Sequence, residues 1–134
     1  MSTTPLPHPN IDSQPYWDGA ARDELRYQRC TACQHAQFPP RAQCLRCGGE
    51  VAWQLSAGAG VVHSYTRVER APSAAFKAQL PYGIVLVDMA EGFRLMLNLR
   101  DSPLDAVQIG APIRVIFEAT AEAGLKLPQA MLVE

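Results

Sequence analysis

Four cysteines, set in two closely spaced pairs, are the residues of this chain with the clearest chemistry. Two residues separate the members of each pair, and ten residues, 34–43, separate the two pairs. A tight turn aims both thiolates of a pair at one ion, and two such turns complete a tetrahedron of sulfur ligands. The spacing therefore predicts one structural zinc ion held by Cys30, Cys33, Cys44 and Cys47.

Two other interpretations of the cysteines stay open on the sequence alone. A redox-active Cys-x-x-Cys pair usually stands singly at the start of a helix, and iron accepts four thiolates in the same geometry as zinc. Disulfides are disfavoured in a reducing cytosol, where four cysteines within residues 30–47 indicate a metal site. Because sulfur fills all four coordination positions, the metal is expected to be structural rather than catalytic.

The residues that follow each cysteine pair are expected to turn the backbone. Gly48 and Gly49 follow the second pair and adopt positive φ without steric cost. Gln34 and His35 follow the first pair, at a place where a glycine would be easier. We predict a modest backbone strain after the first pair, which leaves the metal ligands unaffected.

Basic side chains are concentrated around the predicted metal site. Residues 25–49 contain no acidic residue but four arginines, Arg26, Arg29, Arg41 and Arg46. Guanidinium groups bind phosphate oxygens through paired hydrogen bonds. The segment is therefore expected to be either a site for a nucleotide-like or phosphorylated ligand, or a solvated basic face.

Two apolar segments are candidates for contact with another protein. The rigid run Phe38, Pro39 and Pro40 lies between the cysteine pairs, where it either supports the turns or faces a partner. Tyr16 and Trp17 share one face of a predicted short helix, where they either pack in the core or contact the partner. These five residues form the predicted partner-binding set.

The elements that must position these residues follow from the rest of the pattern. Residues 1–12 are rich in proline and are expected to form an extended arm. A helix capped by Asp12 or Ser13, with Pro15 in its first turn, should follow and end near Asp23. Five apolar or β-branched runs then predict strands at 61–68, 82–89, 93–99, 114–119 and 126–133.

These five strands are expected to close, wholly or in part, into a small barrel, because closure removes apolar sheet edges. Short helical turns are expected within 74–78 and 103–110. The predicted fold is mainly β, with an arm and helix at 1–24, a zinc ribbon at 25–52 and a barrel at 53–134.

The composition excludes several classes of protein. The 12 basic and 13 acidic residues nearly cancel, which argues against a generic nucleic-acid binder. No apolar run reaches the roughly 18 to 20 residues that cross a bilayer, and the N-terminus lacks a secretory signal, so a cytoplasmic protein without a membrane partner is expected. The three histidines, His8, His35 and His63, suggest no triad, and the acidic residues are scattered, so no catalytic residue is predicted.

Several motifs occur together in this chain: Pro15-Tyr16-Trp17, the two cysteine pairs, Phe38-Pro39-Pro40-Arg41, Gly58 and Gly60 with Val62, Ser64-Tyr65-Thr66 and Val68, and Pro81-Tyr82. In this combination the chain resembles the family known as domain of unknown function 35, over about residues 14–132. That family joins an N-terminal helix and a rubredoxin-like zinc ribbon to an OB-fold barrel. Two positions depart from its pattern, because Gln34 stands where glycine is usual and Leu45 where proline is frequent. Neither position supplies a metal ligand.

The resemblance implies a function in which this chain alone has no catalytic activity. Members of the family are accessory subunits of acyl-CoA enzymes and pair with thiolase-like proteins, lipid-transfer-type aldolases or acyltransferase complexes. A role in lipid metabolism follows, with Arg41 and Arg46 as candidate ligands of the CoA moiety of an acyl-CoA. The alternative hypothesis is a single-stranded nucleic-acid binder, a role that OB-folds and zinc ribbons also serve, although the predicted barrel strands carry few aromatic and basic residues.

Overall fold

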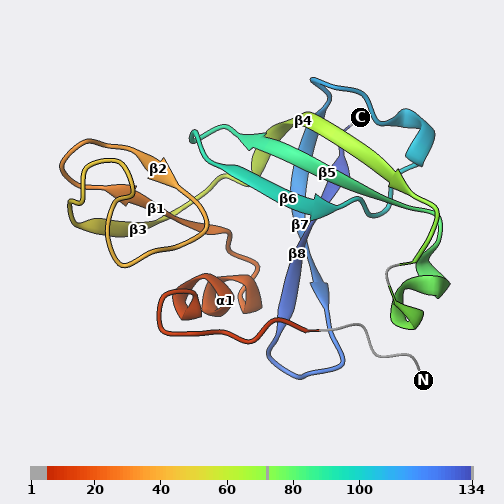
Figure 1. The fold of residues 1–134 in the computed structure, drawn as a ribbon, viewed down its shortest axis with the longest axis horizontal. Coiled ribbons are helices and arrows are strands. Elements are labelled where there is room, and N and C mark those ends of the chain that lie inside the picture. The colour runs from red at the N-terminus through yellow and green to blue at the C-terminus, as the bar shows by residue number, and fades with distance from the viewer. Residues whose placement is uncertain (1–5, 72, 134) are drawn as a thin grey trace.

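The computed structural model describes residues 6–71 and 73–133 (Figure 1). Within these residues one α-helix, α1 (Gln14–Ala21), precedes a three-stranded sheet in the cysteine segment and a five-stranded sheet after it. The predicted fold class is confirmed, because a helix, a four-cysteine ribbon and a nearly closed five-stranded barrel follow one another in a mainly β chain. In the described part of the chain, no helix is long and apolar enough to cross a membrane.

The helix begins where the sequence indicated, but Ser13 does not cap it through its side chain. Pro15 occupies the first turn, where its missing N–H leaves no hydrogen bond unmade. The Ser13 hydroxyl instead accepts a hydrogen bond from the Asn10 N–H at 3.0 Å, and Asn10 Oδ1 accepts one from the Ser13 N–H at 2.9 Å. The helix ends at Ala21, and Asp23, with a φ of 61°, turns the chain towards the ribbon.

The ribbon consists of β1 (Arg26–Cys30), β2 (Ala36–Gln37) and β3 (Val51–Leu55), in the spatial order β2-β1-β3. The turn after each cysteine pair contains a residue in the left-handed region, Gln34 with a φ of 65° and Gly48 with a φ of 76°. The first turn therefore holds a residue with a side chain in a conformation that favours glycine. The expected boundary between residues 52 and 53 falls inside β3, which pairs with β1 along its whole length.

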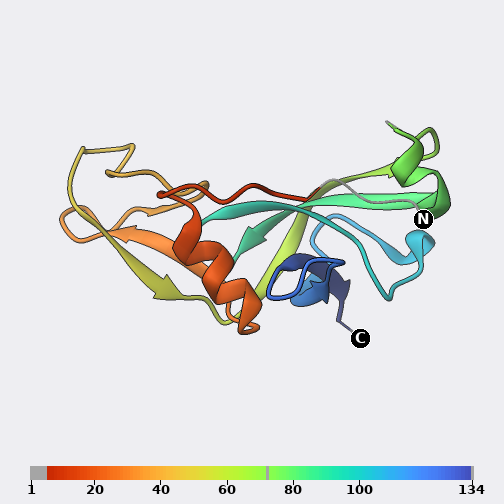
Figure 2. The same cartoon turned by 90° about the horizontal axis from the view of Figure 1, so that it is seen from below.

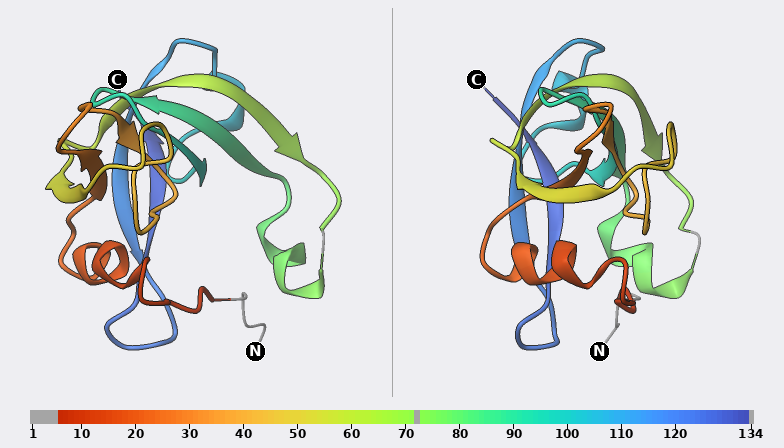
Figure 3. Two further views of the ribbon diagram at one scale, coloured as in Figure 1. Left: turned by 60° about the vertical axis from the view of Figure 1, so that its left-hand side comes forward. Right: turned by 90° about the vertical axis from the view of Figure 1, so that its left-hand side faces the viewer.

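The barrel consists of β4 (Ala59–Val68), β5 (Tyr82–Met89), β6 (Arg94–Asn98), β7 (Pro112–Ala119) and β8 (Lys126–Leu132), in the order β6-β5-β4-β7-β8. A parallel bridge between Leu99 and Ala130 brings its two outer ends together. β4 pairs with β7 only over its first three residues, so the barrel stays open along the rest of β4 (Figure 3). All five predicted strands are present, and η1 (Ala74–Gln79) and η2 (Leu104–Ala106) occupy the two loops where helical turns were expected.

Aromatic rings join the ribbon and the helix to the barrel. Phe93, which precedes β6, stacks on Tyr27 of β1 with ring centroids 4.6 Å apart and an interplanar angle of 12°. Phe38 lies 6.4 Å from Phe93 and 4.9 Å from Tyr16 of α1, measured between ring centroids. These residues form one hydrophobic cluster with the inward side chains of the barrel. Figure 2 shows α1 between the ribbon and the β7–β8 hairpin, and α1 contacts both β1 and β8.

A carboxylate from the β5–β6 hairpin fixes the linker between the two sheets. Glu91 Oε1 accepts a hydrogen bond from the Ser56 hydroxyl at 2.7 Å, and Glu91 Oε2 accepts one from the Ala57 N–H at 2.8 Å. The backbone carbonyl oxygen of Glu91 accepts a third hydrogen bond, from Arg29 Nη2 of the ribbon at 3.1 Å. One hairpin residue therefore binds both the linker and the ribbon.

We expect Glu91→Ala to lower the free energy of unfolding by about 1–3 kcal/mol, because the Ser56 hydroxyl and the Ala57 N–H lose their acceptor. Urea denaturation followed by circular dichroism measures the change. Glu122→Ala removes a carboxylate from an exposed loop, and this control should stay within about 0.5 kcal/mol of wild type. Equal stability of the two variants would contradict the role assigned to Glu91.

Candidate metal centre and its surroundings

The two cysteine pairs converge on one point, where the four sulfur atoms lie within 4.8 Å of one another. The Sγ atoms of Cys30 and Cys47 are 3.5 Å apart, and those of Cys33 and Cys44 are 3.7 Å apart, so the two pairs interleave. Four sulfur atoms bound to zinc at about 2.3 Å in a regular tetrahedron would be about 3.8 Å from one another. The donor set and its geometry therefore fit a zinc ion with no open coordination position. Neither pair lies at the start of a helix among the described residues, unlike a redox-active pair.

Backbone N–H groups of the cysteine turns support the thiolates. The N–H groups of Ala32 and Cys33 donate to Cys30 Sγ at 3.3 and 3.4 Å, and the Arg46 N–H donates to Cys44 Sγ at 3.4 Å. The hydrogen bond from the Cys33 N–H is the main cause that lowers the pKa of Cys30 to about 6. Because the thiolate is the form that binds metal, the first turn favours the ligand state of Cys30 before any metal is bound.

The two glycines after the second pair have different tasks. Gly48 has the positive φ that turns the chain. Gly49 provides space, because a Cβ at this position would lie 3.1 Å from Cys30 Sγ and 3.2 Å from Cys47 Sγ. The expectation that both glycines serve the turn is thus corrected, since a side chain at Gly49 would crowd the metal ligands.

Two of the four arginines near the metal centre form ion pairs or hydrogen bonds with other residues of this chain. Arg26 forms an ion pair with Glu24 at 2.9 Å, and Glu24 lies just outside the segment that lacks acidic residues. The guanidinium of Arg29 donates hydrogen bonds to the carbonyl oxygens of Gln34 and Glu91 and to the side chains of Tyr27 and Gln54. The basic surface expected from the sequence is therefore smaller than four arginines would suggest.

Arg41 and Arg46, the two predicted CoA ligands, are both exposed. Arg41 Nη1 donates to the carbonyl oxygen of Pro40 at 2.9 Å, which leaves the rest of its guanidinium facing solvent. Within residues 6–71 and 73–133, the Arg46 side chain has no hydrogen bond or ion pair. Both side chains are available to an anionic group, and their assignment to CoA stays a prediction.

The five predicted partner contacts differ in burial. Tyr16 is 5% exposed and Pro40 is buried, so both belong to the packing of this chain, and a partner contact through them stays a prediction. Burial raises the pKa of the Tyr16 phenol well above its ordinary value. Trp17 and Phe38 are half-buried, and Pro39 is exposed. We call Trp17, Phe38 and Pro39 the aromatic edge; both of its rings lie 4.9 Å from the Tyr16 ring beneath them.

Three polar residues that hold these parts together were not found from the sequence. Gln28 and Gln37 are buried in the ribbon, and Glu91 binds the linker from the barrel. A glutamine or glutamate is common on protein surfaces, so nothing in the local sequence distinguishes one that is bound inside.

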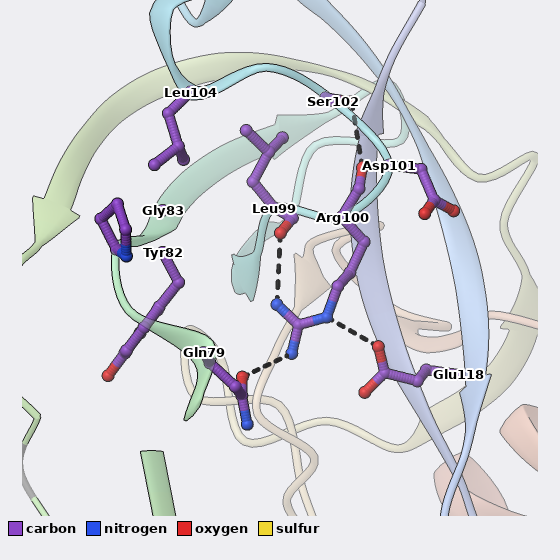
Figure 4. A pocket seen from close by; sticks show the side chains of 10 residues that line it. Gln79, Tyr82, Gly83, Leu99, Arg100, Asp101, Ser102, Leu104 and Glu118 are labelled. Atoms are coloured by element: carbon purple, nitrogen blue, oxygen red, sulfur yellow. Dashed lines mark hydrogen bonds and ion pairs between the residues drawn. The ribbon is translucent and has the colours of Figure 1, made fainter. Parts of the chain in front are cut away.

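A cavity of about 440 Å³ lies at the end of the barrel away from the ribbon (Figure 4). Arg100 extends along its wall, where Nε donates to Glu118 Oε2 at 2.7 Å and Nη2 donates to Gln79 Oε1 at 3.1 Å. Nη1 of the same guanidinium donates to the Leu99 carbonyl oxygen at 3.2 Å. Glu118 balances the charge of Arg100, so this guanidinium serves the packing of the barrel end and offers no free charge to an anion.

A zinc ribbon that shares its core with a nearly closed five-stranded barrel defines the class of protein. The family model described as the ChsH2 rubredoxin-like zinc ribbon domain matches residues 17–53, and that described as the ChsH2 C-terminal OB-fold domain matches residues 53–118. The chain belongs to the DUF35 family of zinc-ribbon and OB-fold proteins. Together with the sulfur geometry, this membership identifies the cofactor as structural zinc.

Three known proteins show how far the similarity extends. A DUF35 domain-containing scaffold protein of Methanothermobacter thermautotrophicus is 30% identical over 105 residues, which cover 77% of this chain and 78% of that protein. A probable enoyl-CoA hydratase alpha subunit of Thermomonospora curvata is 36% identical over 126 residues, which cover 92% of this chain but only 38% of that longer protein. The solved structure described as Ltp2-ChsH2(DUF35) aldolase superposes with a TM-score of 0.82 at 33% identity, covering 95% of this chain and 98% of the chain compared.

Proposed function

We propose that this chain is a non-catalytic accessory subunit of an acyl-CoA-processing complex. Its partner is a thiolase-like enzyme or a lipid-transfer-type aldolase, and it acts in the cytoplasm, where the thiols of the zinc site stay reduced. The observation that carries the proposal is the similarity over nearly the whole length of a chain in the Ltp2-ChsH2(DUF35) aldolase structure. The names of the other two relatives, a scaffold protein and a subunit of an enoyl-CoA hydratase, support the same role.

The geometry of the ribbon supports a binding role rather than a catalytic one. Four sulfur ligands leave the metal no position for a substrate. The aromatic edge presents rigid, half-buried rings on a shared core, and such anchors commonly dominate the energy of an interface. Arg41 and Arg46 are exposed, so their guanidinium groups can bind a CoA phosphate or carboxylates of the partner.

We expect the tagged full chain to retain a thiolase-like or aldolase enzyme from an extract of its native cell. Trp17→Ala and Phe38→Ala should each weaken this retention by about tenfold or more, because each truncates an anchor of the aromatic edge. Tyr65→Ala is the matched control, since Tyr65 is an aromatic residue of β4 that is 50% exposed and lies outside the edge. Quantitative co-purification measures retention, and a zinc assay on each variant shows that the ribbon is intact.

Three outcomes would contradict parts of this proposal. Variants that keep their zinc and bind the enzyme as tightly as wild type would show that the aromatic edge is not the interface. Robust turnover of acyl-CoA thioesters by the isolated chain, abolished by substituting one of its own residues, would show that it is an enzyme. Recovery of single-stranded nucleic acid in place of an enzyme would establish the alternative function.

A further inference from the structure

Two buried glutamines on adjacent strands bind a loop segment through their side chains. Gln28 on β1 and Gln37 on β2 face each other in the strand register. Their residues are only 3% and 4% exposed. A buried amide without hydrogen-bond partners is destabilising, so the partners of these two amides indicate what they hold in place.

Each amide binds the backbone of residues 41–45, which run from the end of the proline turn into the second cysteine pair. Gln28 Oε1 accepts a hydrogen bond from the Arg41 N–H, and Gln28 Nε2 donates to the Arg41 carbonyl oxygen, both at 2.9 Å. Gln37 Oε1 accepts a hydrogen bond from the Leu45 N–H at 2.9 Å, and Gln37 Nε2 donates to the Gln43 carbonyl oxygen at 3.2 Å. Two side chains thus bind this backbone in the way that a neighbouring strand would.

The two glutamines are also bound to each other. Gln37 Nε2 donates a hydrogen bond to Gln28 Oε1 at 2.9 Å. Exchanging the oxygen and nitrogen of either amide would set a donor against an N–H and an acceptor against a carbonyl oxygen, so the network fixes both orientations. The result is one buried network that spans the segment from Arg41 to Leu45.

We infer that Gln28 and Gln37 are positioning residues that link the zinc site to the turn at 38–41. The bound segment begins at Arg41, next to the aromatic edge, and ends at Leu45, next to the ligand Cys44. Because one network holds both ends, fixing Cys44 on zinc restrains the turn, and an ordered turn in return favours zinc binding. That the turn meets a partner rests on the proposed function, whereas the link between metal and turn does not.

Gln28→Met and Gln37→Met test the link, because methionine keeps the length of the side chain and removes its hydrogen bonds. Zinc should pass from the reduced full chain to a chromogenic chelator about tenfold or more faster than in wild type, the range seen when groups that orient metal ligands are removed. Gln43→Met is the matched control, because Gln43 is exposed and its side chain makes no hydrogen bond within the described residues. This control should release zinc at the wild-type rate.

Amide hydrogen exchange, followed by NMR, separates positioning from a general loss of stability. Exchange of the Arg41 amide in Gln28→Met, and of the Leu45 amide in Gln37→Met, should be about tenfold or more faster. The amides of Val85 and Val87, which are fully buried in the barrel, should keep their wild-type protection. Removing zinc from the wild-type chain with EDTA should also accelerate exchange of the Arg41 amide.

Zinc release within about twofold of the control would overturn the inference. Unchanged exchange of the Arg41 amide after zinc removal would overturn it as well. So would a methionine variant in which the amides of Val85 and Val87 lose as much protection as the amides of Arg41 or Leu45. The zinc-removal experiment needs no substitution, so unchanged exchange of the Arg41 amide overturns the inference even where a methionine variant does not fold. All these measurements use the isolated chain, so a failure to capture an enzyme would overturn the proposed function and leave this inference standing.

Discussion

Replacing Cys44 with serine is expected to remove the zinc ion from this protein. Purified under reducing conditions, the wild-type chain should carry about one zinc ion and the Cys44→Ser chain less than about 0.1. A serine hydroxyl is a far weaker zinc ligand than a thiolate, and three sulfur atoms cannot complete a closed site. Cys44 is 3% exposed, so solvent has little room to supply the missing ligand in an otherwise unchanged ribbon.

Loss of the zinc ion should also lower the stability of the protein, because the free energy of zinc binding contributes to the folding of a small ribbon. Apparent binding free energies of about 10–16 kcal/mol are typical for structural zinc in peptides of this kind. The ribbon shares its core with the barrel through Tyr27 and Phe93. We therefore expect Cys44→Ser to lower the melting temperature of the barrel as well as that of the ribbon.

Ala32→Ser is the matched control for this experiment, because it places the same hydroxyl in the first cysteine turn without removing a ligand. It should keep about one zinc ion per chain. Elemental analysis and thermal denaturation measure the two effects. A Cys44→Ser chain with full zinc content and wild-type stability would show that the assigned set of ligands is wrong.

Phe93→Ala should lower the free energy of unfolding by about 3–5 kcal/mol, the usual cost of removing a buried aromatic ring. Phe93 is 3% exposed, stacks on Tyr27 and lies close to Phe38, so its ring belongs to the ribbon and the barrel alike. A loss of this size is a large part of the roughly 5–15 kcal/mol that stabilises an ordinary domain. Met96→Ala on β6 is the control, because Met96 is 72% exposed.

The same variant tests whether the ribbon and the barrel unfold together. Both tryptophans, Trp17 and Trp53, lie in the helix and the ribbon, so their fluorescence reports this half of the molecule. Circular dichroism reports the sheets as a whole. The two transitions should coincide in the wild-type chain and separate in Phe93→Ala. Coincident transitions in the variant, or stability equal to that of Met96→Ala, would contradict the joining role of Phe93.

Structural features that depend only on neighbouring residues in the sequence were predicted well. The two cysteine pairs predicted the convergence of four sulfur atoms, because each turn of a Cys-x-x-Cys pair is a local structure. The five barrel strands were predicted for the same kind of reason, since runs of apolar and β-branched residues between turn residues indicate strands wherever they occur. The positive φ at Gly48 and the difficult position of Gln34 also follow from the turn itself.

Features that depend on which elements meet could not be chosen from the sequence. Core packing and partner contact both stayed open for Tyr16 and Trp17, and the structure buries Tyr16 but leaves Trp17 half-buried, because packing against the ribbon covers one ring more than the other. Arg29 also lies in a segment without acidic residues, but packing against the barrel brings the Glu91 carbonyl oxygen to its guanidinium. Burial and charge of this kind are set by contacts rather than by residue type.

The sequence by itself determined the four sulfur ligands and the order of helix, ribbon and barrel, because those follow from local spacing and periodicity. Only the tertiary structure decided how the three parts form one core and which surface they leave exposed. Glu91 binds Ser56 across 35 positions of sequence, and Gln28 binds Arg41 across 13, and neither pairing has a local pattern. A hydrogen bond between distant residues depends on where the backbone brings them, and that is settled by the packing of the whole chain.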